Sequence, residues 1–253
     1  MTAYTVMPLR YSNNVPAMVE FLTTLGLTRH VTTLGDGFAE LSAAAGRVMV
    51  HAAHSADASA ATAGDTVICF STPSADHAVE HLDTAGLDTT IWDESYGRQA
   101  MVTTPRGEAV WINEEQEDLY GYQGPEAAQP DPRLIVSAIL PSPDFGSDRA
   151  FYSHFGLTPD PGASEWWEGL RGPGGVVGLH MPEPGWTPAL EFEDPRYRYP
   201  LIMLGFQTAE PLEDLRDRLL AAGYEARIVS VPEATKVHVT DPDGQEIEIH
   251  PLP

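Results

Sequence analysis

Two histidines occupy matching positions in the two halves of the chain. His51 closes the apolar run RVMVH, His180 closes the run VVGLH, and each lies ten residues after a leucine, Leu41 or Leu170. A neutral imidazole can both donate and accept a hydrogen bond near neutral pH. The pair therefore predicts a hydrogen-bonding or proton-transfer site in each half, with His51 and His180 as catalytic candidates. The alternative is that each ring bonds the backbone at the end of its strand.

The run EIEIH near the end of the chain alternates polar and apolar residues. Because side chains alternate along a strand, Glu246, Glu248 and His250 share one face. Glu248 could then lie near His250 or His238 and take part in a ligand or metal site. Alternatively, Glu246 and His250 form an exposed strand edge.

Aromatic side chains form a third group of candidates. Trp92, Trp111 and Trp166 fall in predicted strands and loops, and Trp166 is followed directly by Trp167. If both of these adjacent tryptophans lie on one strand, only one of them can face a binding site. Flat aromatic walls suit a planar or bulky organic ligand, and the alternative is ordinary core packing.

Several other chemistries lack the residues they need. The single cysteine, Cys69, excludes a disulfide framework within the chain and a cysteine-based zinc site. No G-x-S-x-G nucleophile motif occurs. The glycines of RGPGG (171–175) predict a hairpin turn and not a phosphate-binding loop, because no helix follows them.

The elements that must position these residues are repeated along the chain. The segment 85–113 aligns without a gap with 222–250, and LGLT at 25–28 matches FGLT at 155–158. We therefore predict two modules, at residues 1–115 and 133–253. An acidic linker rich in Pro and Gly, residues 116–132, separates them. Two further loops, 52–65 and 182–200, interrupt the repeat.

Each module is expected to contain the order βαβββ twice. Leucine and valine spacing predicts helices over 15–25 and 212–222, each followed by glycine, and Ser74 is the expected N-cap of a helix that ends at Gly86. The predicted strands include 47–51, 66–70, 201–206, 236–240 and 246–250. Four βαβββ units in one chain predict an α+β fold class.

Composition limits the partners of the protein. The 253 residues hold 14 basic and 37 acidic side chains, a formal charge of −23, which excludes nucleic-acid binding and docking on anionic lipid. Neither a signal peptide nor an apolar run long enough to span a membrane is seen, so we expect a cytoplasmic protein.

The segment FYSHFGLT (151–158) and the ending TDPDGQEIEIH (240–250), within this repeated layout, resemble the vicinal oxygen chelate superfamily. This superfamily contains glyoxalase I, bleomycin-resistance proteins and extradiol dioxygenases. The resemblance implies that paired βαβββ units curl their sheets into cups. It also implies that enzymes of the group bind a divalent metal in the cup, whereas resistance proteins bind a drug there without one.

The same resemblance implies four metal-ligand positions in each module, on the first and last strand of each half-module. In this chain only His180 and Glu248 of the second module, and His51 of the first, carry a side chain at these positions that can bind a metal. Three protein ligands are the usual minimum for a catalytic zinc or non-haem iron. The positions fall near Met7, on His51, near Val67 and on Trp111 in the first module, and near Ser137, on His180, near Leu204 and on Glu248 in the second.

The leading hypothesis is therefore a drug-sequestering, antibiotic-resistance type of protein that binds a small organic molecule in an aromatic cup. We expect no cofactor; the metal candidates, should a divalent ion bind, are His180 and Glu248. The alternative is a lyase, isomerase or dioxygenase of the group that uses a divalent metal or a histidine general base. A monomer or homodimer is expected, and which half-modules pair to form the cups stays open. The predicted ligand-binding residues are His51, His180, Trp92, Trp111, Trp166 and Glu248.

Overall fold

The computed structural model describes residues 3–33, 35–55, 60–94, 97–115, 122–124, 128–192, 197–232 and 234–253. Most of the predicted linker at 116–132 and part of the loop at 52–65 lie outside these residues.

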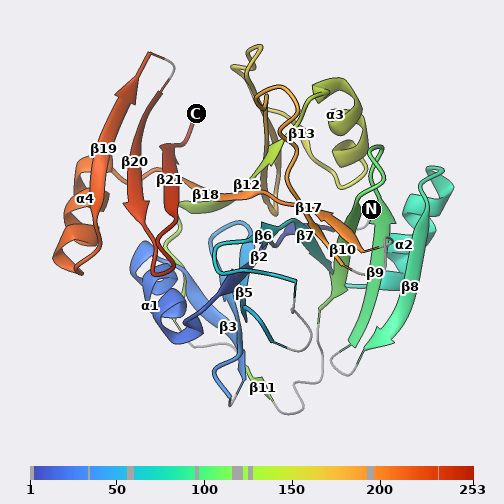
Figure 1. The fold of residues 1–253 in the computed structure, drawn as a ribbon, viewed down its shortest axis with the longest axis horizontal. Coiled ribbons are helices and arrows are strands. Elements are labelled where there is room, and N and C mark those ends of the chain that lie inside the picture. The colour runs from blue at the N-terminus through green and yellow to red at the C-terminus, as the bar shows by residue number, and fades with distance from the viewer. Residues whose placement is uncertain are drawn as a thin grey trace.

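Four βαβββ units follow one another along the chain, which confirms the predicted α+β class (Figure 1). The first unit contains β2 (Leu9–Ser12), α1 (Val15–Leu25), β3 (Thr28–Thr33), β4 (Phe38–Ser42) and β5 (Arg47–Ala52). The second contains β6 (Thr66–Val67), β7 (Cys69–Thr72), α2 (Ala75–Thr84), β8 (Thr89–Glu94), β9 (Gly97–Thr103) and β10 (Ala109–Glu114).

The second half of the chain repeats this order. The third unit contains β12 (Leu134–Pro141), α3 (Phe145–Ser153), β13 (Thr158–Pro159), β14 (Trp167–Gly172) and β15 (Gly175–His180). The fourth contains β18 (Met203–Thr208), α4 (Leu212–Ala221), β19 (Ala226–Val231), β20 (Ala234–Thr240) and β21 (Glu246–Pro251). The remaining strands are β1 (Thr5–Val6), β11 (Tyr122–Gln123), β16 (Ala189–Glu191) and β17 (Arg198–Pro200).

Helices α1, α2 and α4 lie where the sequence predicts them, and two of them have a side-chain cap. The Asn14 side chain accepts a hydrogen bond from the backbone N–H of Ala17 and caps α1, and Gly26 ends that helix at a φ of 114°. Ser74 caps α2 by accepting from the backbone N–H of His77, as predicted. Among the described residues, no helix is long and apolar enough to cross a membrane.

The sheets pair half-modules that belong to the same half of the chain. The third and fourth units form one eight-stranded sheet in the order β13-β14-β15-β12-β18-β21-β20-β19. The first two units form a six-stranded and a five-stranded sheet, β11-β3-β4-β5-β2-β6 and β1-β7-β10-β9-β8. The predicted strand 66–70 is thus corrected to two strands, because β6 pairs with β2 in one sheet and β7 pairs with β1 and β10 in the other.

The helical faces of the sheets pack across the two halves of the chain. Side chains of α1 and α4 share one buried core with β21, and side chains of α2 and α3 share another. The Arg10 guanidinium of β2 forms a buried ion pair with Asp241, in the turn that precedes β21. The two halves therefore share their cores, while each half keeps its own concave face.

Candidate functional site

The molecule has two concave sheet faces with different contents. We use cup 1 for the face enclosed by the five- and six-stranded sheets, and cup 2 for the concave face of the eight-stranded sheet. Cup 1 is lined by a buried apolar cluster drawn from both of its sheets, including Leu9, Tyr11, Met49 and Cys69, with Trp111 packed against it.

A hairpin from the second half of the chain fills cup 1. Strands β16 and β17 place Leu190 and Tyr199 within the same apolar cluster, where they are 5% and 1% exposed. The Tyr199 ring lies 4.4 Å from the Trp111 ring, centroid to centroid. On β17, Arg198 Nη1 donates to Glu108 Oε1 at 3.0 Å, which ties the hairpin to the first half. Cup 1 is therefore a packed core.

The predicted residues of the first half lie in or beside this core. His51 is half-buried between the rings of Tyr11 and Phe38, and its Nδ1 lies 2.9 Å from the backbone oxygen of Ala52. Trp92 lies on the edge strand β8, and its Nε1–H donates to Glu94 at 2.6 Å. His51 thus contacts the backbone at its own strand end, and Trp111 packs against the hairpin.

In cup 2, two rings from distant strands meet. Trp167 on β14 and His250 on β21 have nearly parallel rings, 11° between planes and 6.5 Å between centroids. These strands are four positions apart in the sheet, a separation of roughly 19 Å if the sheet were flat. The sheet must therefore curl strongly, so that its two arms face each other across cup 2.

The position of the Trp167 ring depends on a glycine. A Cβ at Gly178, on the neighbouring strand β15, would lie 2.1 Å from Cη2 of Trp167. The indole therefore lies directly over the backbone of Gly178, where only glycine leaves room for it. Of the adjacent pair, it is Trp167 that faces cup 2, whereas Trp166 precedes β14 and is 59% exposed.

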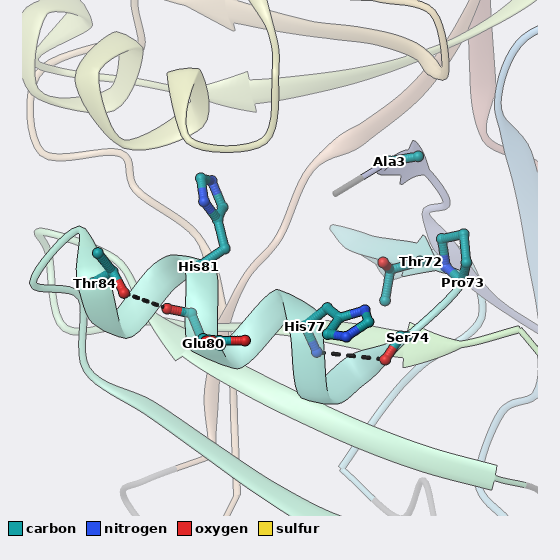
Figure 2. A pocket seen from close by; sticks show the side chains of 8 residues that line it. All are labelled: Ala3, Thr72, Pro73, Ser74, His77, Glu80, His81 and Thr84. Carbon is teal, nitrogen blue, oxygen red and sulfur yellow. Dashed lines mark hydrogen bonds between the residues drawn. The ribbon is translucent and has the colours of Figure 1, made fainter. Parts of the chain in front are cut away.

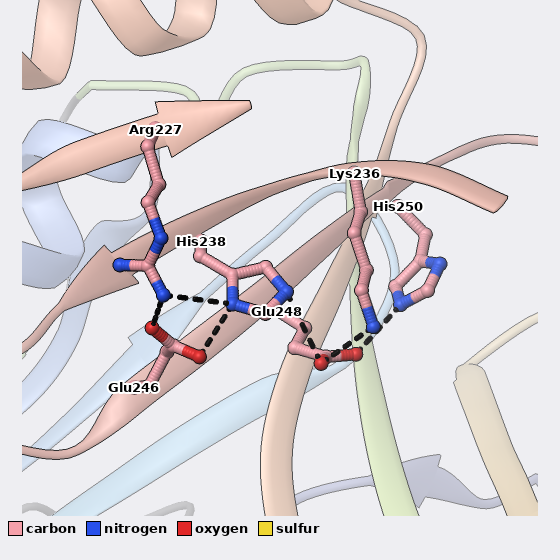
Figure 3. A network of polar contacts seen from close by, with 6 residues as sticks. All are labelled: Arg227, Lys236, His238, Glu246, Glu248 and His250. Carbon is pink, nitrogen blue, oxygen red and sulfur yellow. Dashed lines mark hydrogen bonds and ion pairs between the residues drawn. The ribbon is translucent and has the colours of Figure 1, made fainter. Parts of the chain in front are cut away.

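Glu248 is the centre of a polar network beside these rings (Figure 3). Lys236 Nζ donates to Glu248 Oε1 at 2.6 Å, and His238 Nε2 lies 3.3 Å from the same oxygen. His250 Nε2 lies 3.0 Å from the other oxygen, Oε2. Oε1 of Glu248 thus faces nitrogen atoms from the neighbouring strand β20, and Oε2 faces a nitrogen atom from its own strand β21.

The charge on Glu248 is stabilised by this network. Burial acts to raise the pKa of Glu248, but the hydrogen bonds from His250 and Lys236 outweigh it and bring the pKa to about 2. Next to it, Glu246 is paired with Arg227 and with Nδ1 of His238. Cup 2 therefore contains fixed, balanced charges beside an aromatic wall.

The residues of cup 2 do not form the metal site that the fold family implies. Among the described residues, no group of three or more His, Cys, Asp or Glu side chains is arranged to hold a metal ion. One oxygen of Glu248 is already ion-paired with the ammonium group of Lys236, and this positive charge repels a metal cation. His180 is exposed at the end of β15, where its Cα pairs with those of Trp167 and Pro141.

Sequence reasoning underrated three residues of this site: Trp167, Lys236 and His250. Each lies two residues along its strand from another cup 2 position, Gly169, His238 or Glu248 respectively. Alternation could therefore have grouped them, but it could not show which face of the strand was concave.

A separate surface hollow of about 550 Å³ lies beside α2, outside both cups (Figure 2). Its lining includes His77, Glu80 and His81 along one helix, and His81 Nε2 lies 3.1 Å from the backbone oxygen of His154. None of the residues predicted for ligand binding lines this hollow.

Comparisons of sequence find no match: neither a known protein-family profile nor a curated protein sequence matches this chain. Comparison of structures finds similar folds over the whole chain. A catechol 2,3-dioxygenase matches 100% of this chain and 89% of its own length, with a TM-score of 0.61 and 14% identity.

Two further structures show the same similarity. The 2,3-dioxygenase LapB from Pseudomonas sp. KL28 has a TM-score of 0.62 and 13% identity, covering 99% of this chain and 91% of its own. A Mn(II)-bound glyoxalase from Novosphingobium aromaticivorans has a TM-score of 0.59 and 11% identity, covering 99% and 83%. The chain therefore has the same fold as these dioxygenases and this glyoxalase, in agreement with the fold that its sequence motifs predict.

Proposed function

We propose that this protein binds a small organic molecule in cup 2 without a resident metal ion, in the manner of a drug-sequestering protein. The observation that carries the proposal is the aromatic wall of Trp167 and His250, next to the Glu248–Lys236 ion pair. Aromatic faces with a few fixed polar groups are the usual composition of small-molecule sites.

Cup 1 is not the binding site in this proposal. The side chains of Leu190 and Tyr199 occupy the apolar cluster into which a ligand would have to enter. The predicted ligand-binding role of His51 and Trp111 is therefore not carried forward, and Trp167 and His250 join Glu248 as the proposed ligand-contacting residues. We expect one ligand per chain and a monomer or homodimer, because cup 2 is built within one chain.

Isothermal titration calorimetry against a panel of planar organic compounds and antibiotics tests this proposal. We expect at least one compound to bind with a stoichiometry near one, and Trp167→Ala to weaken it about tenfold or more through loss of the stacking surface. Trp166→Ala is the matched control, because that ring is 59% exposed and adjacent in sequence.

Elemental analysis of protein purified without chelators provides an independent check. Stoichiometric manganese, iron or zinc in the purified protein, lost in a Glu248→Gln variant, would contradict the metal-free proposal. Binding that is equally affected by Trp166→Ala and Trp167→Ala would contradict the location in cup 2.

A second candidate function is an enzyme with a histidine general base. It is favoured by the contact between His250 Nε2 and Glu248 Oε2 at 3.0 Å, because a carboxylate orients an imidazole for proton transfer. Proton exchange from a bound carbon acid into D₂O, followed by NMR, separates the two functions. Exchange that is abolished by His250→Gln while binding persists would favour the enzyme.

A further inference from the structure

Lys236 has hydrogen-bonding capacity that the network of cup 2 does not use. An ammonium group has three N–H donors. In the described part of the chain, Lys236 Nζ donates to one acceptor, Glu248 Oε1, and the lysine side chain is 16% exposed. Two donors of a cation at the edge of an aromatic wall are therefore available to an incoming molecule.

The other cations of this sheet are held elsewhere. Arg227 lies on the edge strand β19, is paired with Glu246 and is 57% exposed, and Arg171 contacts both Asp160 and the side-chain oxygen of Gln207. Lys236 shares the carboxylate of Glu248 with His250, so it is the cation of cup 2 that is tied to the aromatic wall.

The acceptor oxygens of the network, unlike the N–H groups of Lys236, already face several nitrogen atoms. Glu248 Oε1 faces Lys236 and His238, and Glu248 Oε2 faces His250. A ligand that offered hydrogen-bond donors or a positive charge would compete with these three nitrogen atoms and be repelled by the ammonium, whereas a ligand oxygen would be attracted to the ammonium and could accept its remaining N–H groups. The network therefore selects for an acceptor on the ligand and against a donor.

The acceptor must lie close to the stacked ring of the ligand. His250 belongs to both parts of the site, because its ring stacks on Trp167 and its Nε2 contacts Glu248, which holds Lys236. A planar ligand beside Trp167 and His250 would therefore place a substituent of its ring system at the ammonium.

Resting on the function proposed above, we propose that cup 2 selects planar aromatic ligands that carry a carboxylate, phenolate or carbonyl oxygen, and that Lys236 binds this oxygen. Its ammonium supplies the positive charge that a bound divalent metal would otherwise supply. A charge-assisted hydrogen bond of this kind is stronger than one between neutral groups.

Three probes with the same ring system test the inference: 2-naphthoate, 2-naphthamide and 2-naphthylmethylamine. Calorimetric titration should show that naphthoate binds most tightly, naphthamide less tightly and the cationic amine most weakly. Lys236→Met should weaken naphthoate about tenfold or more and leave the amine within about twofold. Lys236→Arg should restore much of the naphthoate affinity, because it keeps the charge.

Removing Lys236 leaves Glu248 without its ammonium partner, and the unpaired carboxylate could itself repel naphthoate. A second variant therefore removes both charges. This double variant, Lys236→Met with Glu248→Gln, should also lose the preference for naphthoate over the amine. Circular dichroism and thermal unfolding verify that each variant folds.

The possible failures are distinguishable. Equal binding of naphthoate and the amine would contradict the proposed selection by Lys236. So would an unchanged naphthoate affinity in Lys236→Met. In either case the binding function stands if Trp167→Ala weakens all probes. If none of the probes binds at millimolar concentration while another compound of the panel binds through Trp167, the class of ligand is wrong. If no compound binds through Trp167, the binding function fails as well.

Discussion

The two cups of this protein come from the same repeated unit, yet they have opposite contents. Cup 1 is apolar and filled by the β16–β17 hairpin, with Tyr199 only 1% exposed. Cup 2 has charged side chains on its concave face and no hairpin among its described contacts. The same repeated unit thus gives one cup that is a packed apolar core and one cup with a charged concave face.

The difference can be followed at equivalent positions, 137 residues apart. Trp111 of cup 1 corresponds to Glu248 of cup 2, and Gln99 corresponds to Lys236. In cup 1 the indole packs on Tyr199, and the Gln99 side chain donates to Asn113 at 2.7 Å. In cup 2 the same two positions hold an ion pair. At these two positions, therefore, a neutral pair in cup 1 is replaced by a charged pair in cup 2 on the same kind of strand.

The largest expected effect on the free energy of unfolding comes from removing the tyrosine ring that fills cup 1. Tyr199→Ala should lower the free energy of unfolding by about 3–5 kcal/mol, because it removes a buried ring and leaves a cavity. Met203→Ala in β18, at a residue that is 43% exposed, is the control and should cost less than about 1 kcal/mol. Denaturant unfolding measures both variants. Similar losses of unfolding free energy would contradict the conclusion that cup 1 is packed more tightly than the surface at Met203.

A smaller effect is expected from filling the space under Trp167. Gly178→Ala should displace the indole and lower the free energy of unfolding by about 1–3 kcal/mol, because the new methyl group overlaps its ring. The same variant should weaken ligand binding. Near-ultraviolet circular dichroism and calorimetry report the two consequences, and unchanged ligand affinity would show that the ring position does not matter for binding.

The negative charge of Glu248 in cup 2 should make the free energy of unfolding depend on pH in the acid range. Glu248 has a pKa of about 2 in the folded protein and an ordinary value of 4.5. A lowered pKa adds stability that is complete above pH 4.5 and is lost as the pH falls toward 2. Glu248→Gln should therefore reduce the slope of unfolding free energy against pH between 4.5 and 2. A variant with the same slope as the parent protein would show that Glu248 is not stabilised as a carboxylate.

The smallest effect is expected outside both cups. Trp166→Phe alters a side chain that is 59% exposed, so unfolding free energy should change by no more than about 0.5 kcal/mol. Thermal unfolding measures this. A loss of several degrees would show that Trp166 packs against the cups more closely than its exposure indicates.

Much of the fold follows from local sequence signals. The helix at 15–25, the Ser74 cap and the strand 246–250 were predictable because capping chemistry and periodicity act over a few residues. The site was less predictable. Glu248 was identified from the family-like ending, but its partner Lys236 lies in another strand, and Trp167 could not be distinguished from Trp166 by alternation alone.

The sequence by itself determined the repeated segments and the order of the elements, because both depend on residue identity and spacing. Only the tertiary structure decided that strands β16 and β17 fill cup 1 and that Trp167 meets His250 across cup 2. The physical reason is that these contacts join residues about 80 or more positions apart. They arise from sheet curvature and from burial of apolar surface, and neither is encoded in local spacing.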